Sequence, residues 1–187
     1  RSIPGQKGGR FLASGNEHNP SGHISEDPSN RIAQMDRRQG KLDSVRSMLD
    51  EAESQQTAFG PDEAEYGILT WGSQQGTVRE AVRRLNENGE SVKALSVSDM
   101  APFAAEEVSA FLESVDEALV VEMNASAQFR GLTQKEIGRF GEKLSSLLKY
   151  NGNPFEPGEI VDGFVTSIVE DGSLPGHETT FVPAAGD

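Results

Sequence analysis

The residues best suited to chemistry follow a predicted strand over residues 118–121. Glu122 comes next, and Asn124, Ser126 and Gln128 lie after it in a polar turn. A carboxylate beside amide groups could bind a ligand or move a proton, and in parallel sheets such groups gather at the carboxyl ends of strands. The alternative is structural, with Glu122 and Asn124 capping the next helix and hydrogen-bonding the neighbouring loop. We favour the structural interpretation.

A second candidate is the turn at Gly72 and Ser73. The apolar run over residues 68–71 predicts a buried strand, and apolar residues at 78, 81, 82 and 85 predict an amphipathic helix after it. Gly72 lets the backbone leave the strand sharply, and Ser73 could cap the helix. A helix N-terminus here could bind an anion. Because any α/β unit needs such a turn, a plain connection is the favoured interpretation.

These two turns supply the predicted ligand or interface contacts, while catalytic residues and metal ligands are predicted to be absent. The contacts are Gly72, Ser73, Glu122, Asn124 and Gln128. The chain has no nucleophile elbow, no phosphate-binding loop and no dinucleotide-binding glycine motif. It also has no cysteine, which excludes disulfides, thiolate metal sites and an iron–sulfur cluster carried by this chain.

The histidines are weak candidates for a metal site. His18 and His23 lie in a Gly-, Asn- and Ser-rich loop with Glu17 and Glu26 nearby, but their spacing matches no zinc pattern. We expect them to be structural or exposed. The third, His177, falls in a tail rich in Gly, Pro and Thr.

Charge and composition limit the function classes. The 187 residues include 30 acidic and 17 basic residues, for a net charge of −13, which disfavours binding to nucleic acid or an anionic membrane. The excess of acids could form a docking face for a basic partner or adapt the surface to a salt-rich cytoplasm. Because acids run from Glu17 to Asp187 without one block, we favour salt adaptation. No segment has the length and apolarity of a membrane span, and no signal peptide pattern opens the chain, so we expect a soluble cytoplasmic protein.

The order of patterns predicts five segments. Residues 1–27 form an extended arm, 28–56 a long amphipathic helix that starts at an Asp27 cap and Pro28, and 57–65 a linker. Residues 66–170 form a compact domain and 171–187 a mobile tail. The fold class is α/β: in the compact domain, alternating strands and helices predict a three-layer α/β/α sandwich around a mostly parallel sheet of four to five strands.

The motifs of this domain resemble the alpha subunit of 2-oxoacid:ferredoxin oxidoreductases, and the 2-oxoglutarate branch is the most similar. The resemblance rests on five motifs in order and, with similar segments upstream at residues 14–18, 22–28 and 37–42, covers roughly residues 10 to 165. The five motifs are residues 69–73, residues 80–82, Pro102-Phe103 before 106–108, the turn 122–128, and the segment 149–155 with Glu159-Ile160. Ala127 departs from the pattern, since the family often has glycine there.

The resemblance implies a transketolase C-terminal-like domain that supports assembly and is not catalytic alone. In this family it follows a thiamine-diphosphate-fold domain, and the abrupt start at Arg1 suggests a fragment. The implied complex oxidatively decarboxylates a 2-oxoacid, 2-oxoglutarate or pyruvate, to its acyl-CoA and reduces ferredoxin. It would use thiamine diphosphate, magnesium, an iron–sulfur cluster and coenzyme A, with a beta subunit as partner.

Two alternatives stay open. One is a stand-alone module that binds an anion or nucleotide at the Gly72 and Asn124 turns. The other is the C-terminal domain of a transketolase or 2-oxoacid dehydrogenase, which would use the same fold without ferredoxin.

Overall fold

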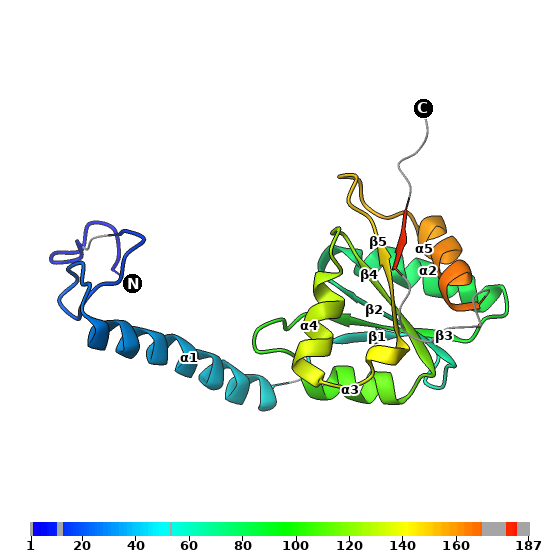
Figure 1. Ribbon diagram of the computed structural model, residues 1–187, viewed down its shortest axis with the longest axis horizontal. Helices are drawn as coiled ribbons and strands as arrows, with labels where there is room; N and C mark the ends of the chain where they lie inside the picture. Colours follow the sequence, from blue (N-terminus) through cyan, green and yellow to red (C-terminus); the bar gives the residue numbers. More distant parts are fainter. Residues whose placement is uncertain (1, 11–12, 53, 170–178, 183–187) are drawn as a thin grey trace. The chain divides into compact units, whose positions relative to one another are not determined.

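The computed structural model describes residues 2–10, 13–52, 54–169 and 179–182, and divides the chain into two compact units. The first unit is residues 1–53 and the second is residues 54–187. Figure 1 shows a long helix in the first unit and a helix-covered sheet in the second. Each unit is described by itself below.

Helix α1 (Pro28–Asp50) forms most of the first unit. Its start is as predicted: the Asp27 carboxylate accepts the Asn30 N–H at 2.8 Å, and Pro28 takes the first helical position. Its predicted end at residue 56 is wrong. The helix ends at Asp50 with Glu51 as its C-cap, and the Ala52 N–H donates to the Leu49 carbonyl. Farther on, the Gln55 carbonyl accepts the Ser98 hydroxyl and Gln56 Oε1 accepts the Ser98 N–H, just after β3.

The loop before α1 is held to the helix by the Glu17 carboxylate and by the Asn30 side-chain amide, which donates to the His18 carbonyl at 3.2 Å. Glu17 pairs with Arg31 and Arg38, which lie two turns apart on the helix. The loop is closed by a bridge between His18 and Ile24. The described part of the arm is therefore organised by polar contacts.

The second unit contains a six-stranded sheet in the order β1-β3-β2-β4-β5-β6. Strands β2 to β6 run parallel, and β1 pairs antiparallel with β3. The strands are β1 Thr57–Phe59, β2 Tyr66–Trp71, β3 Val92–Val97, β4 Glu117–Glu122, β5 Leu144–Leu148 and β6 Thr179–Phe181. The helices are α2 Gln75–Glu87, α3 Ala105–Glu113, α4 Gln128–Ile137 and α5 Pro157–Phe164. Short turns are η1 Gly72–Gln74, η2 Gly141–Lys143 and the π-helical η3 Val165–Val169.

Two cores cover the two faces of this sheet. Helices α2 and α5 pack on one face through a set that includes Leu85, Ile160 and Phe164. Helices α3 and α4 pack on the other through a set that includes Leu112 and Phe129. Figure 1 shows both helix pairs against the sheet, so the predicted three-layer sandwich with a mostly parallel sheet is confirmed.

The sheet has six strands instead of the predicted four to five because both of its edges were missed. Residues 57–59 form β1, so the predicted linker is wrong there. Residues 179–181 form β6 beside β5, within the predicted tail. The rest of that tail, with His177, lies outside the described residues, apart from Val182, whose N–H donates to the Leu148 carbonyl.

Among the described residues, no helix has the length and apolarity to cross a membrane.

Candidate interface at the carboxyl edge of the sheet

The carboxyl ends of four adjacent parallel strands meet at one edge of the sheet, in the order β3, β2, β4, β5. The chain leaves β2 toward β3 on one side and reaches β4 on the other side. This reversal places the topological switch point, the usual ligand position in such sheets, between β2 and β4. The Gly72 turn follows β2 and the Asn124 turn follows β4, so the structure brings the two predicted turns to the same switch point.

Glu122 is fully buried at the end of β4 and serves as a helix cap. Its carboxylate accepts the backbone N–H of Phe129 at 2.7 Å and of Arg130 at 3.1 Å, and the Asn124 side-chain amide at 2.5 Å. These donors lie at the start of α4, where the helix dipole favours negative charge. Both oxygens are engaged, so Glu122 has a structural role and is not placed to accept a substrate proton.

Asn124 continues the same cap. Its side-chain oxygen accepts the backbone N–H of Ser126 at 3.0 Å and of Gln128 at 3.2 Å, and the Gln128 side chain is exposed. Ala127 adopts a left-handed conformation at φ 49°, which explains why glycine suits this position. The predicted capping role of Glu122 and Asn124 is confirmed.

Nearby, Arg130 is partly buried in the first turn of α4. Burial lowers the pKa of its guanidinium, and the negative charge of Glu122 opposes that shift.

The Gly72 turn differs from the prediction in one respect. Gly72 has φ +64°, as a sharp turn requires, but the 3-10 turn η1 lies between the strand and α2. Neither η1 nor α2 has a side-chain hydrogen bond at its N-cap, so the predicted Ser73 cap is wrong. The extra turn moves the start of α2 to Gln75 and leaves the Ser73 side chain exposed.

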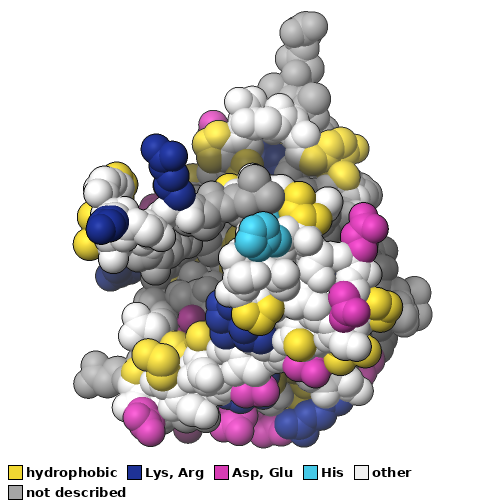
Figure 2. All heavy atoms as spheres, turned by 90° about the vertical axis from the view of Figure 1, so that its left-hand side faces the viewer, with side chains coloured by type: hydrophobic (Ala, Val, Ile, Leu, Met, Phe, Trp, Pro, Cys, Tyr) yellow, Lys and Arg dark blue, Asp and Glu magenta, His cyan; other side chains and the backbone are white. Residues whose placement is uncertain are grey.

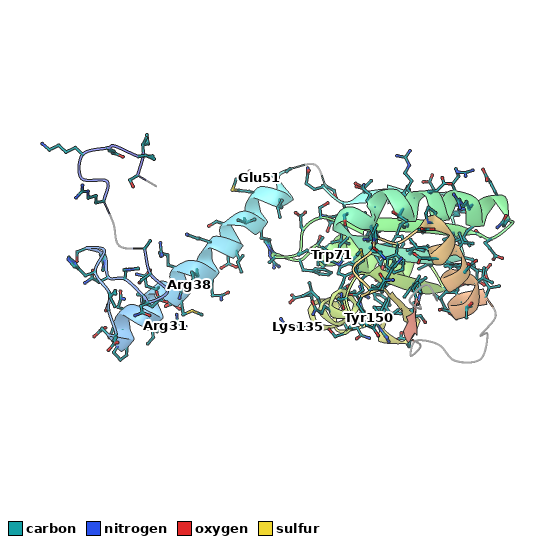
Figure 3. The ribbon with its side chains drawn as sticks, turned by 90° about the horizontal axis from the view of Figure 1, so that it is seen from above. Arg31, Arg38, Glu51, Trp71, Lys135 and Tyr150 are labelled. Carbon is teal, nitrogen blue, oxygen red and sulfur yellow. The ribbon has the colours of Figure 1, made fainter. Side chains whose placement is uncertain are left out.

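Three large side chains at this edge were not predicted as contacts. Trp71, Met123 and Tyr150 stand at or just after the ends of β2, β4 and β5, and they are 42%, 38% and 63% exposed. We call these three residues the edge row. Trp71 was expected in a buried strand, but it is the last residue of β2 and passes beyond the helical layers. Figure 3 shows Trp71 and Tyr150 at the same end of the second unit. Neighbouring strands lie about 4.8 Å apart, so the edge row follows adjacent strands.

A buried polar seam lies beneath the edge row at the switch point. Thr70 donates its hydroxyl to the Val121 carbonyl at 3.1 Å and so links β2 to β4. The Gln74 side chain is 5% exposed, its amide nitrogen contacts the Met123 sulfur, and its amide oxygen has no partner among the described residues. A buried acceptor without a partner is costly, so this oxygen lowers the stability of the turn.

The described residues contain no group of three or more His, Asp or Glu side chains that could hold a metal ion. His18 and His23 lie in the first unit, each 3.3 Å from a serine hydroxyl, Ser14 and Ser21 respectively.

The carboxyl edge of the sheet combines the apolar contact area of the edge row with neighbouring hydrogen-bonding groups. This is the composition of a binding surface.

Residues 64–160 match the family described as pyruvate:ferredoxin oxidoreductase core domain II. The alpha subunit of 2-oxoacid:ferredoxin oxidoreductase 1 from Sulfurisphaera tokodaii is 33% identical over 158 residues, covering 84% of this chain and 24% of the relative. The corresponding Aeropyrum pernix subunit is 31% identical over 160 residues, with the same two coverages. The chain thus spans about a quarter of the length of these relatives.

Solved structures give the same picture. The 2-oxoglutarate:ferredoxin oxidoreductase of Magnetococcus marinus, solved with 2-oxoglutarate, coenzyme A and succinyl-CoA bound, superposes with a TM-score of 0.67 at 30% identity. The superposition covers 88% of this chain and 28% of that one. A split-gene transketolase superposes with a TM-score of 0.50 at 10% identity, over 60% of this chain and 41% of that one, which shows a shared fold only.

Proposed function

Since the chain belongs to the pyruvate:ferredoxin oxidoreductase core domain II family, we propose that it is the assembly domain of a 2-oxoacid:ferredoxin oxidoreductase alpha subunit. The observation that carries the proposal is the family match, which spans the second unit from just before β2 into α5. The complete enzyme would convert a 2-oxoacid, 2-oxoglutarate or pyruvate, to its acyl-CoA and pass electrons to ferredoxin.

The cofactors of such an enzyme do not fit this chain. An iron–sulfur cluster needs thiolate ligands, and the sequence has no cysteine. The most buried carboxylate at the edge, Glu122, is fully occupied by three donors. The cluster would therefore be held by another part of the complex, and we assign thiamine diphosphate, magnesium and coenzyme A to other parts as well, including a beta subunit. No chemical step is assigned to this chain.

The carboxyl edge is the surface we assign to docking. Trp and Tyr carry much of the binding energy at protein interfaces, and Met is enriched there. The edge row offers one of each, next to exposed Ser73 and Gln128 and the turn at Gly72. Gly72, Ser73, Asn124 and Gln128 would thus act as interface residues, and Glu122 would hold their loop in shape.

The test is copurification of the complete alpha subunit with a tagged iron–sulfur beta subunit. Trp71→Asp and Tyr150→Asp should each reduce recovery at least tenfold, because a charge would enter an apolar contact. Val169→Asp is the matched control, since Val169 is 38% exposed and lies away from the edge row on η3. Full recovery of both edge variants would contradict docking at this edge. Oxidation of 2-oxoglutarate by the isolated chain with thiamine diphosphate and an electron acceptor would contradict the non-catalytic role.

We also propose that the protein works in a salt-rich cytoplasm. The acidic excess lies entirely in residues 54–187, with 22 acidic and nine basic residues, whereas residues 1–53 have eight of each. Figure 2 shows acidic side chains at several separate places on one face. Salt screens the repulsion between such charges, so molar potassium chloride should stabilise the second unit. Equal thermal stability with and without salt would contradict this adaptation.

A further inference from the structure

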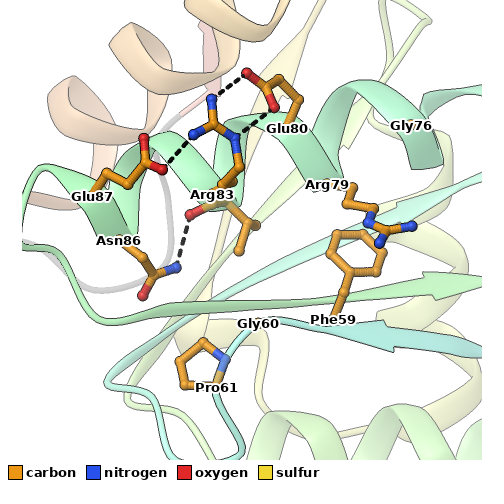
Figure 4. Close-up of a pocket in the computed structure, with 10 residues that line it drawn as sticks. Phe59, Gly60, Pro61, Gly76, Arg79, Glu80, Arg83, Asn86 and Glu87 are labelled. Carbon is orange, nitrogen blue, oxygen red and sulfur yellow. Dashed lines mark hydrogen bonds and ion pairs between the residues drawn. The ribbon is translucent and has the colours of Figure 1, made fainter.

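A groove runs along α2 beside the edge strand β1. It has a volume of about 690 Å³ and is bounded by the turn after β1 and by the exposed side of the helix. A second hollow of about 420 Å³ shares Phe59, Gly76 and Arg79 with it. Figure 4 shows Phe59 and Pro61 on one side of the groove and the charged residues of α2 on the other. The docking role of the carboxyl edge does not account for this groove.

Strand β1 offers an unused side to the groove. It lies at the end of the strand order and pairs only with β3, with Thr57 and Ala58 exposed. Among the described residues, no other strand and no loop backbone group bonds to it. An edge strand with free N–H and C=O groups is a template for an added strand.

The turn after β1 fixes this edge in place. Gly60 has φ +104°, and a Cβ there would lie 2.9 Å from both the Lys93 Cα and the Val92 carbonyl oxygen. The backbone therefore sits directly on β3, and Pro61 rigidifies the next residue. A rigid edge needs little ordering when a ligand binds, which favours affinity.

Among the described ion pairs of α2, Arg79 takes part in none, so its charge is available to a ligand. Arg83 and Arg84 both bind Glu80, and Arg83 also binds Glu87. Hydrogen bonds from Arg83 and Arg84 lower the pKa of Glu80 to about 2, so Glu80 stays ionised and engaged. Arg79 has no ion pair or hydrogen bond among the described residues, and Figure 4 shows it reaching toward the Phe59 ring.

We propose that this groove binds an extended segment of a partner protein, which adds a strand to β1 and places a carboxylate against Arg79. The backbone of β1 supplies the hydrogen bonds, and the lining by Phe59, Pro61 and Val82 receives apolar side chains two residues away from the carboxylate, which lie on the same face of the added strand. Arg79 favours an acidic residue because its guanidinium makes no ion pair with the described residues that line the groove. The inference does not depend on the function proposed for the carboxyl edge.

The test is a titration of the ¹⁵N-labelled full chain with the peptide acetyl-VTETV-amide, whose two valines and glutamate share one face of a strand, monitored by backbone amide shifts. Shifts should be centred on residues 57–60 and 75–87. Arg79→Ala should weaken binding about tenfold, because it removes a charge-assisted hydrogen bond. Arg84→Ala removes the same charge from the same helix outside the groove, so it should leave binding within about twofold.

Changes in the peptide test strand addition without altering the protein. Acetyl-VTKTV-amide should bind at least tenfold more weakly, and N-methylation of the three central residues of the acidic peptide should abolish binding. Undiminished binding of the N-methylated peptide, shifts centred outside the groove, or no shifts at millimolar peptide would each overturn the proposal. Equal weakening by Arg79→Ala and Arg84→Ala would also overturn it, because the effect would then be general electrostatics.

Discussion

Helices α1 and α5 begin in the same way and are stabilised differently. Each starts with an acidic residue followed by proline, Asp27-Pro28 in α1 and Glu156-Pro157 in α5. Helix α1 has 23 residues and buries almost none of them, whereas α5 has eight residues and buries Ile160, Gly163 and Phe164. The comparison teaches that capping decides where a helix begins, while packing of one face decides how stable it is.

The largest expected difference between these helices comes from truncating one apolar side chain in each. Phe164 is fully buried and its ring meets Tyr66 edge-on, with centroids 5.8 Å apart. Phe164→Ala should lower the free energy of unfolding by about 3–5 kcal/mol because it leaves a cavity. Met48→Ala in α1 removes a side chain that is 70% exposed and should change it by less than about 0.5 kcal/mol. Urea unfolding measures both, and equal losses would contradict the comparison.

The next effect concerns the ion pair that anchors the start of α5. Lys149 is 4% exposed, and its ammonium group donates to both oxygens of Glu159 at 2.6 and 2.7 Å and to the Pro154 carbonyl at 2.8 Å. Lys149→Met should cost about 2 kcal/mol at pH 7, because Glu159 loses its partner while staying partly solvated. Lys135→Met is the control, since Lys135 is 77% exposed.

The same pair should make stability depend on pH. Burial works to raise the pKa of Glu159, but the hydrogen bonds from Lys149 and from the Glu156 N–H outweigh it and lower that pKa below its ordinary 4.5. A lowered carboxyl pKa contributes stability above the ordinary value, and that contribution is lost as pH falls through the lower one. The cost of Lys149→Met should therefore shrink below about pH 4.5. A cost independent of pH between 7 and 3 would argue against an ionic role.

Replacing either of two helical glycines with alanine should change the free energy of unfolding, in opposite directions for the two positions. A Cβ at Gly163 in α5 would lie 2.6 and 2.7 Å from the two Leu147 methyl groups, whereas a Cβ at Gly40 in α1 would meet nothing within 4 Å. Gly163→Ala should destabilise the second unit by about 1–3 kcal/mol through overpacking. Gly40→Ala should stabilise α1 by about 0.5–1 kcal/mol through helix propensity. Urea unfolding and helical circular dichroism check the two, and a gain from Gly163→Ala would show that Leu147 can move.

The difference between buried and exposed elements explains which parts of the fold could be predicted from the sequence. The four inner strands and the helices that cover them are buried, so their apolar spacing predicts them. The edge strand β1 has three residues, two of them exposed, and β6 is equally short, so neither has a usable pattern. The end of α1 at Asp50 was missed because no buried face marks it, and the bonds that hold Gln55 and Gln56 beside β3 are long-range.

The features of the candidate site are likewise of two kinds, those set by local sequence and those set by tertiary contacts. The capping roles of Glu122 and Asn124 follow from their place between a strand and a helix, which is local information. The exposure of Trp71, Met123 and Tyr150 depends on how far each strand extends past the helical layers. The freedom of Arg79 depends on which neighbours pair with one another. These features depend on tertiary contacts, so no periodic pattern in the sequence predicts them.

The smallest expected effect lies in the first unit, whose described residues form no buried apolar cluster and are held by polar contacts. The hydrogen bond from Arg38, assisted by that from Arg31, lowers the pKa of Glu17 to about 2. Glu17→Gln should release the loop from α1, because an amide binds two guanidinium groups far less well than a carboxylate does. Hydrogen exchange should then speed up at the Asn19 and Ser25 amides, which bond within this loop.

The second unit should keep its melting temperature in Glu17→Gln, because the loop belongs to a separate compact unit. Glu26→Gln is the matched control, since Glu26 is exposed in the same loop and makes no ion pair among the described residues. In the unaltered chain, protection should persist as pH falls through the ordinary 4.5 and disappear only near 2, because the charge of Glu17 must be neutralised first. Unchanged exchange in Glu17→Gln would mean that the hydrogen bonds within the loop, together with the bond from Asn30 to the His18 carbonyl, hold the loop without the Glu17 ion pairs.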